Sequence, residues 1–463
     1  MMRKNHSLKF SIGAFAIIAG MAILSAFSAY ADNEQTLPEQ QYLMTIAEKL
    51  TNKHSNVENS KQELTFKDVP KLRPKEVTFA TWQDLLNWKP GARPDDDINR
   101  SSVPLASRYQ GSLINKTANP EAQLQALSNM NSKAATRSSV GDEEFNAYAF
   151  DYWQYVHSMV YWDGLVPTPD VIDAAHRNGV PIYGSLFFNW STKVEDQKRL
   201  LEAMKQDSDG SFPIAKKLAE IAKYYGYDGY FINQETWAGN LPGLPTKIRD
   251  FIIYLKEYSR SIGHPLTVSW YDAMLNNGKR EYINGLNDQN DFYLKAREAD
   301  KKIAADTLFA NFNWTKSSID ESVKHAKTIG RNPYDVYAGL ELQKGGSYKT
   351  DVNWNSLLDP LTKKLKTSLG LFAPDTIISF GKTGEEYHRH ENRFWTGFQG
   401  DPTVEQPANQ KWRGISNLIA DRTPITGTTF NTYFNTGHGR KWFVDGAISK
   451  DGPWNYRSVS GIL

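Results

Sequence analysis

One pattern recurs along the chain and restricts its fold more than any other feature: a helical run ends at a glycine, and an apolar strand follows at once. The unit occurs at residues 170–188, 214–233, 248–271 and 319–342, with Gly179, Gly226, Gly263 and Gly330 at the junctions. Glycine just past a helix adopts the left-handed conformation that closes the last turn. The strands are continuous apolar runs, as in parallel strands covered on both faces. This alternation predicts a parallel α/β fold.

The number of strands then selects the architecture. Four more strands are predicted at residues 155–162, 307–313, 368–373 and 423–433. About eight strands alternating with helices are typical of a (β/α)8 TIM-like barrel. A doubly wound sheet is the alternative, but no GxGxxG follows the first strand. The sequence therefore predicts a (β/α)8 barrel.

The amino-terminal region is predicted to be an export signal followed by a leader. Basic residues precede an apolar run at 10–27, and an A-x-A site ends at Ala31. Cleavage there predicts a secreted or cell-surface protein with no membrane segment. The alternative is an uncleaved membrane anchor, because the apolar run is long enough to span a bilayer. Residues 32–67 are predicted to form a polar leader with a helix at 38–53, and residues 68–463 the barrel domain with its amino-terminal flank.

Composition removes several classes of function. The 463 residues include 54 Lys and Arg against 52 Asp and Glu, so the net charge of +2 predicts no nucleic-acid surface. The absence of cysteine excludes disulfides, Cys-ligated zinc, iron–sulfur clusters and cysteine nucleophiles. The chain has 13 Trp, 23 Tyr and 22 Phe, more than a core built on Leu, Ile and Val requires. Some of these rings are therefore expected to face a ligand.

Tryptophans mark the predicted carboxyl ends of several strands. The five at or just beyond those ends are Trp162, Trp190, Trp237, Trp270 and Trp314. In a barrel these ends form the active-site face, so the five rings are predicted to bind substrate there. Rim packing is the alternative for any one of them. Flat apolar rings beside Asn and Asp suit sugars, which present C–H faces to an aromatic ring and hydroxyls to polar groups.

A catalytic pair is predicted in the strand whose residues 228–235 read DGYFINQE. Residues two apart on a strand face the same way, so Asn233 and Glu235 both face the pocket. An Asn-x-Glu is common by chance, and its position at a strand end is what gives it weight. The spacing is similar to the DGxDxDxE strand of chitinase-like barrels, with Glu235 in the place of the general acid. It suggests glycoside hydrolysis in which the 2-acetamido oxygen of the substrate attacks the anomeric carbon.

From about Thr78 to its end the chain resembles the endo-β-N-acetylglucosaminidases of glycoside hydrolase family 85. The segments that carry the resemblance are WKPGARPDDDINRSSVPL (88–105), YWQYV (152–156), AAHRNG (174–179), YFINQET (230–236), WYD (270–272), FNW (312–314), DVYAG (335–339), LFAP (371–374) and FNTGHG (434–439). The resemblance implies cleavage of the β-1,4 bond between the two core GlcNAc residues of N-linked glycans, with transfer to other acceptors. It also implies that Asn233 orients the acetamido group, that Glu235 is the acid/base, and that Tyr271 contacts the oxazoline-forming group.

Other residues near strand ends leave alternatives open. Asp163, Asp272 and Glu341 permit a retaining mechanism with an enzyme carboxylate as nucleophile. We instead expect Asp272, Asn311 and Glu341 to line the substrate site, with Asp272 hydrogen-bonded to the nucleophilic region or to neighbouring loops and Glu341 in contact with sugar hydroxyls. A chitinase-like hydrolase of GlcNAc polymers and a catalytically inactive glycan-binding barrel are the alternative functions.

No metal or cofactor is expected from the sequence. His388-Arg-His390 with Glu385 and Glu386 does not match HExxH and is predicted to be a solvated loop. The partners implied are the N-linked glycans of glycoproteins.

Overall fold

The computed structural model describes residues 77–455, apart from 94–95, 110, 112, 114, 131–147, 149, 238–240, 242, 405, 408–409, 429–437 and 445. The chain divides into two units, Met1–Lys71 and Leu72–Leu463, and every described residue lies in the second. The predicted signal and leader therefore lie outside the described residues. Within the described part, no helix has both the length and the apolar character needed to cross a membrane.

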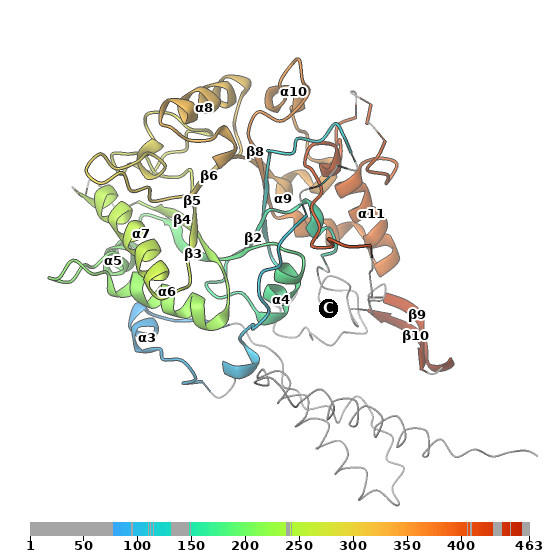
Figure 1. Ribbon diagram of the computed structural model, residues 1–463, viewed down its shortest axis with the longest axis horizontal. Helices are drawn as coiled ribbons and strands as arrows, with labels where there is room; N and C mark the ends of the chain where they lie inside the picture. Colours follow the sequence, from blue (N-terminus) through green and yellow to red (C-terminus); the bar gives the residue numbers. More distant parts are fainter. Residues whose placement is uncertain are drawn as a thin grey trace, which may run out of the picture. The chain divides into compact units, whose positions relative to one another are not determined.

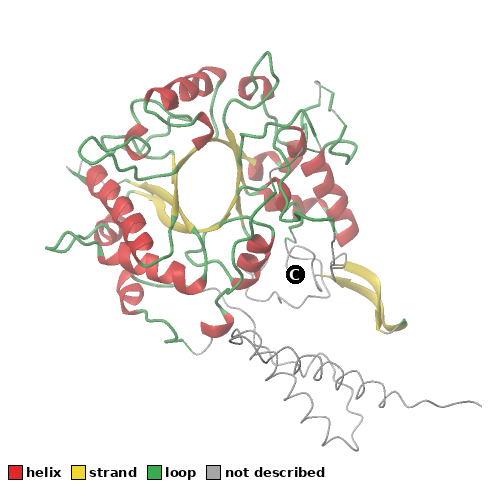
Figure 2. Ribbon diagram, viewed as in Figure 1, coloured by secondary structure: helices red, strands yellow, loops and turns green. Residues whose placement is uncertain are grey.

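Eight parallel strands close into a barrel in sequence order, which confirms the predicted (β/α)8 fold (Figures 1 and 2). The strands are β1 (Leu124–Ser128), β2 (Ser158–Tyr161), β3 (Ile182–Ser191), β4 (Gly229–Thr236), β5 (Thr267–Tyr271), β6 (Thr307–Ala310), β7 (Val336–Glu341) and β8 (Ser368–Phe372). Closure occurs at β1, where Gln125 is in register with Ser158 of β2 and with Gly370 of β8.

Helices surround the barrel on its outer side (Figure 2). The α-helices are α3 (Trp82–Asn87), α4 (Pro169–Arg177), α5 (Val194–Ala203), α6 (Pro213–Tyr225), α7 (Leu244–Ser261), α8 (Lys316–Thr328), α9 (Leu342–Gly345), α10 (Trp354–Leu357) and α11 (Gly384–Thr396). The 3-10 turns are η1 (Asp96–Ile98), η3 (Trp153–Tyr155), η4 (Asp291–Tyr293), η5 (Pro333–Asp335), η6 (Ser347–Lys349), η7 (Pro374–Phe380) and η8 (Ile415–Asn417). An antiparallel pair, β9 (His438–Val444) and β10 (Ala447–Asn455), forms a separate two-stranded sheet.

The helix–glycine–strand unit has the geometry that its sequence predicts. Gly226 follows α6 with φ +87°, and its N–H donates to the Ala222 carbonyl at 2.8 Å. Gly330 follows α8 with φ +73°. A side chain at this φ is strained, so glycine is the residue that lets the chain leave the helix and enter the next strand within a few residues.

One predicted strand is wrong, and one real strand was missed. Of the range 423–433, Thr423 makes only an isolated bridge with Tyr109, and residues 429–433 lie outside the described part. The strand that completes the set of eight is instead β1, at the start of the barrel, with the sequence LQALS. Leu, Gln and Ala are good helix formers with little strand preference. This segment is a strand because β2 and β8 pair with both of its edges, which local sequence does not reveal.

The apolar residues form two clusters, one inside the barrel and one between the barrel and its helices. Inside the barrel lie Leu127, Val160, Tyr183, Phe231, Tyr271, Ala273, Phe309 and Tyr337. A methyl group at Gly370 would lie 2.2 Å from Cε2 of the Phe309 ring. Glycine in β8 therefore leaves the space that this aromatic interior fills.

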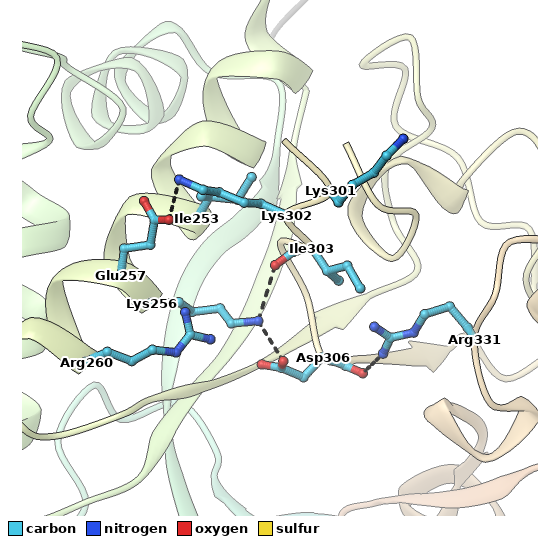
Figure 3. Close-up of a pocket in the computed structure, with 9 residues that line it drawn as sticks. All are labelled: Ile253, Lys256, Glu257, Arg260, Lys301, Lys302, Ile303, Asp306 and Arg331. Carbon is cyan, nitrogen blue, oxygen red and sulfur yellow. Dashed lines mark hydrogen bonds and ion pairs between the residues drawn. The ribbon is translucent and has the colours of Figure 1, made fainter. Parts of the chain in front are cut away.

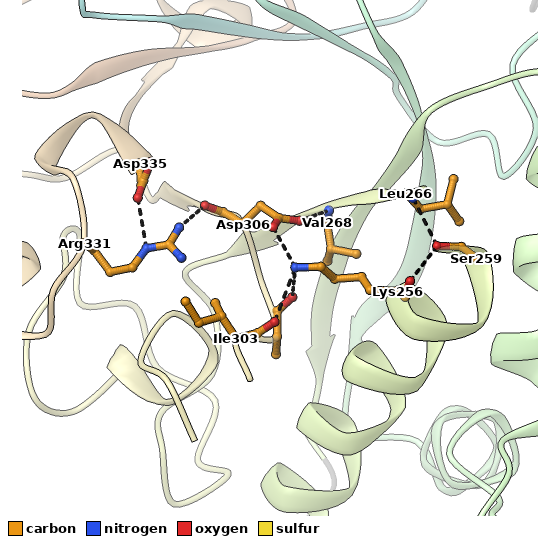
Figure 4. A network of polar contacts seen from close by, with 9 residues as sticks. Lys256, Ser259, Leu266, Val268, Ile303, Asp306, Arg331 and Asp335 are labelled. Carbon is orange, nitrogen blue, oxygen red and sulfur yellow. Dashed lines mark hydrogen bonds and ion pairs between the residues drawn. The ribbon is translucent and has the colours of Figure 1, made fainter. Parts of the chain in front are cut away.

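An ion pair between a buried ammonium and a partly exposed carboxylate joins α7 to the amino-terminal end of the barrel strands (Figure 4). The Lys256 ammonium is 2.6 Å from Asp306 and donates to the Ala304 carbonyl at 3.0 Å. The second oxygen of Asp306 accepts from the Val268 N–H at 2.8 Å, and its carbonyl accepts from Arg331. Figure 3 shows a pocket whose lining includes Lys256, Asp306 and Arg331. Asp306 directly precedes β6, so this pocket lies at the barrel end that stabilises such folds rather than the end that carries their chemistry.

We expect Asp306→Ala to lower the free energy of unfolding by about 2–3 kcal/mol. Removing one partner leaves the Lys256 ammonium buried without a counter-ion, and the cost stays below that of a fully buried pair because Asp306 is partly exposed. The measurement is urea unfolding. The double variant Lys256→Met/Asp306→Ala is the control and should recover part of the loss. A double variant less stable than the single one would contradict this account.

Candidate active site

The carboxyl end of β4 places two functional side chains inside the barrel. Phe231 belongs to the interior cluster, and side chains alternate along a strand, so Asn233 and Glu235 face inward as predicted. Asn233 is 1% exposed, whereas Glu235 is partly exposed. The Nδ2 group of Asn233 donates to Oε2 of Glu235 at 2.8 Å. The barrel thus holds a carboxyl group at its mouth with one oxygen fixed by a buried amide.

The loop after β5 supplies two further contacts to Glu235 that the sequence did not reveal. The Tyr282 hydroxyl donates to Oε1 of Glu235 at 2.5 Å. The Arg280 guanidinium donates to the Glu235 and Ser191 carbonyls at 3.2 Å and 3.3 Å, and it lies 4.3 Å from the centre of the Trp190 ring. Both residues lie in an irregular loop without a motif, so only the closed barrel brings them to β4.

A hydrogen-bonded chain joins Tyr271 to the neighbouring strand ends. The Tyr271 hydroxyl donates to Oδ1 of Asn311 at 2.8 Å, and Nδ2 of Asn311 donates to Oδ1 of Asn284 at 2.9 Å. Burial first, and the negative charge of Glu235 second, raise the pKa of Tyr271. Tyr271 therefore stays a neutral phenol beside Glu235. The structure brings the predicted residues Asn233, Glu235, Tyr271 and Asn311 to the same end of the barrel.

Asp272 organises the loops instead of facing the site. It is 1% exposed and accepts five N–H bonds, from the main chain of Ile283, Asn284, Gly285 and Asn311 and from the side chain of Asn290. Burial raises its pKa to about 7, although these hydrogen bonds act to lower it. The predicted contact between Asp272 and substrate is therefore corrected, because its oxygens are already engaged by the loops after β5 and β6.

Glu341 also has a structural partner at the end of β7. Its Oε1 accepts from the Lys344 N–H at 3.0 Å and caps the short helix α9. The side chain remains partly exposed. Asp163, the other carboxylate considered from the sequence, is exposed and follows β2.

The five predicted tryptophans separate into different environments. Trp190, the penultimate residue of β3, and Trp237, directly after β4, are 64% and 44% exposed. Trp162 is half-buried, with its ring centre 5.2 Å from that of Phe187 and 5.0 Å from that of Phe372. Trp314 is half-buried and donates to the Gly339 carbonyl at 2.7 Å. These four rings lie at or beyond the carboxyl ends of strands, as expected.

The prediction that Trp270 binds substrate is wrong. It is 0% exposed and stacks on Tyr293, with 4.0 Å between ring centres. Because Tyr271 faces the barrel interior, the side chain before it on β5 faces the surrounding layer. Trp270 therefore belongs to the core between the barrel and its outer elements and is not available to a ligand.

We expect Trp270→Ala to lower the free energy of unfolding by about 3–5 kcal/mol, as for other buried aromatic residues. Trp190→Ala is the matched control and should change it by less than about 1 kcal/mol, because its ring is mostly exposed. Urea unfolding of both variants makes the comparison. Similar losses in the two would show that the inward and outward assignment of these rings is wrong.

Known proteins with similar sequences are endo-β-N-acetylglucosaminidases. The chain is 27% identical over 396 residues to the cytosolic endo-beta-N-acetylglucosaminidase of Danio rerio, covering 84% of this chain and 49% of that protein. It is 27% identical over 427 residues to the cytosolic endo-beta-N-acetylglucosaminidase of Gallus gallus, covering 88% of this chain and 51% of that protein. The chain thus spans about half the length of these curated relatives.

These relatives correct the localisation predicted from the sequence. Both are named cytosolic, which contradicts a secreted or cell-surface protein. That prediction is therefore wrong by this comparison. It depended on one apolar run and one A-x-A site at residues 1–31, which lie outside the described part of the chain.

A solved structure and a family model cover the barrel. The crystal structure of the glycoside hydrolase domain of Endo-D from Streptococcus pneumoniae R6 is 61% identical, with a TM-score of 0.79 over 85% of this chain and 61% of that chain. The model of glycosyl hydrolase family 85 matches residues 129–442, which include β2 to β8 and both residues of the β4 pair. The chain belongs to glycosyl hydrolase family 85.

Proposed function

We propose that this chain is an endo-β-N-acetylglucosaminidase that hydrolyses the β-1,4 bond between the two core GlcNAc residues of N-linked glycans. The observation that carries the proposal is the Asn233–Glu235 pair at the carboxyl end of β4, with Tyr271 beside it. Membership of family 85 and the names of the relatives support the reaction class. Glycoproteins that carry N-glycans are the proposed substrates, and transfer of the glycan to other acceptors is a proposed side reaction.

Glu235 is proposed as the general acid and base. The Asn233 amide only donates at Nδ2, so it keeps Oε2 of Glu235 as an acceptor. Tyr282 both donates and accepts through its hydroxyl, so it can turn and accept from a protonated Oε1. The proton for the leaving oxygen is therefore carried on Oε1. After departure of the leaving sugar, the same oxygen takes a proton from the attacking water.

The nucleophile is proposed to be the 2-acetamido oxygen of the substrate. It bonds to the anomeric carbon as the glycosidic C–O bond breaks and the leaving oxygen takes the proton of Glu235, giving an oxazolinium ion. With Nδ2 committed to Glu235, Oδ1 of Asn233 accepts the acetamido N–H and makes the attacking oxygen more electron-rich. A neutral amide does this without a second charge beside Glu235. Water then reopens the ring with retention.

Two of the three alternative carboxylate nucleophiles, Asp272 and Glu341, have other partners. Asp272 is buried and accepts five N–H bonds, so an attack would require it to release two loops. Glu341 is held by the first turn of α9. These contacts favour substrate assistance over an enzyme-bound ester.

Sugar binding is proposed for the aromatic rim and the polar residues next to it. Trp190 and Trp237 offer exposed rings, and Trp162 and Trp314 offer partly exposed ones. Such rings stack on the C–H faces of pyranoses. Asn311 and Glu341 are the proposed polar contacts to hydroxyls, alongside their structural hydrogen bonds.

Glu235→Gln should lower kcat on an N-glycopeptide by about 10²- to 10⁴-fold, because general acid catalysis contributes that much. Glu281→Gln is the matched control: Glu281 lies in the same loop as Tyr282, is exposed and pairs with Lys279 at the surface. We expect the control to stay within about twofold of the parent, since a surface pair contributes little. Activity of Glu235→Gln within threefold of the parent would remove Glu235 from the mechanism.

Asn233→Ala separates substrate assistance from an enzyme nucleophile. The variant should lose hydrolysis of an intact glycopeptide and still transfer a preformed glycan oxazoline to a GlcNAc-peptide. Formation of the oxazolinium needs Asn233, whereas activation of the acceptor needs only Glu235 as a base. Product formation from both donors is followed by chromatography. Equal loss with the two donors, or a glycosyl ester trapped on Asp272 or Glu341, would overturn the mechanism.

A further inference from the structure

A buried carboxyl group outside the active site has no ordinary hydrogen-bond partner. Glu391 on α11 is 0% exposed, and no described donor reaches either of its carboxylate oxygens with ordinary hydrogen-bond distance and angle. Burial first, and the negative charge of Asp151 second, raise its pKa well above the usual range, and weak, long hydrogen bonds from the Tyr387 and Trp395 side chains offset this rise only in part. A carboxyl group in this position requires either a proton or a cation.

Two further metal-ligating side chains converge on Glu391. His388 lies one turn earlier on the same face of α11, because residues three apart are neighbours on a helix. Asp151 comes from the segment before η3. One nitrogen of His388 and one oxygen each of Asp151 and Glu391 all lie within 4.8 Å of one another. His388 is thus in a helix beside buried groups, which corrects its predicted place in a solvated loop.

The distance between His388 and Asp151 fits a small divalent ion. The Nδ1 atom of His388 is 3.5 Å from Oδ2 of Asp151. Two ligands each about 2.0–2.2 Å from a tetrahedral zinc ion are separated by roughly 3.4 Å. One imidazole and two carboxylates are a donor set that suits Zn²⁺. The side chains of His388 and Asp151 are 31% and 20% exposed, so an ion can enter from the solvent side.

We propose that Asp151, His388 and Glu391 form a zinc site, with water in the fourth position. The ion neutralises the two carboxylates and joins α11 to the segment that enters β2. All three ligands lie outside the β4 and β5 residues of the active site, so the zinc site is separate from the catalytic pair. This inference does not depend on the proposed glycosidase activity.

Zinc binding by the untagged full chain tests the proposal. After dialysis against EDTA and then against metal-free buffer, equilibrium dialysis with ZnCl2 is read by elemental analysis. We expect one zinc ion per chain, and a melting temperature that rises with Zn²⁺ and falls again with EDTA. Glu391→Gln and His388→Ala should each weaken the affinity by at least about tenfold, since even outer groups of metal sites contribute 10- to 100-fold.

Matched controls separate this site from adventitious binding. Glu385→Gln changes the same residue type on the same helix, but Glu385 is exposed and pairs with Arg440, so it should bind zinc like the parent. His390→Ala tests the other histidine of the helix in the same way and should also leave the affinity unchanged. Because His388 is partly exposed, His388→Ala keeps the test decisive if Glu391→Gln does not fold.

Three outcomes would overturn the zinc site. If the parent protein bound zinc no more tightly than the Glu391→Gln variant does, the ion would bind elsewhere. A parent that binds no zinc, with Glu391→Gln at least as stable, would identify Glu391 as a buried neutral acid. Tighter binding of Ca²⁺ than of Zn²⁺ in the same dialysis would assign a different ion.

Discussion

The closed barrel imposes a strict alternation of inward and outward side chains, and the candidate active site depends on it. On β4 the alternation directs Asn233 and Glu235 inward above Phe231. On β5 it directs Tyr271 inward and its neighbour Trp270 outward, although both residues lie at the same strand end. Closure is completed by β1, which pairs with β2 and β8 and removes the free edges. No strand can then rotate or slip, because a slip of one residue would exchange its two faces.

The loops above the barrel depend on a second constraint, the buried carboxylate of Asp272. Its five N–H donors come from the loop after β5 and from Asn311 after β6. The same loop carries Tyr282 to Glu235 and Asn284 to Asn311. Asp272 therefore positions groups that contact the catalytic pair, whereas its own hydrogen bonds go to the loops. This role is why a polar residue at a strand end, which sequence reasoning assigns to substrate, is found in the framework.

Sequence reasoning located the parts of the molecule that local pattern controls. The glycine-terminated helices predicted four of the eight barrel strands and other apolar runs predicted three more, because helix ends and apolar runs are local signals. It missed β1, whose strand conformation comes from its two neighbours. It identified Asn233 and Glu235 by position, but not Tyr282 or Arg280, which approach β4 only through the loop after β5. It misplaced Trp270. The sequence shows where a strand ends, but it does not show which of the strand's residues face the barrel interior.

Three carboxyl groups in this chain show how partners, more than burial, separate a reactive acid from a structural one. Asp272 accepts five N–H bonds, and a proton on it would displace one of them even though burial raises its pKa to about 7. Glu391 has no ordinary hydrogen-bond partner among the described residues, so a proton or a cation has to balance it. Glu235 has two partners of different kinds: an amide that can only donate and a phenol that can also accept. Only this third arrangement keeps the carboxyl group in place in both of its protonation states, as a residue that acts first as an acid and then as a base requires.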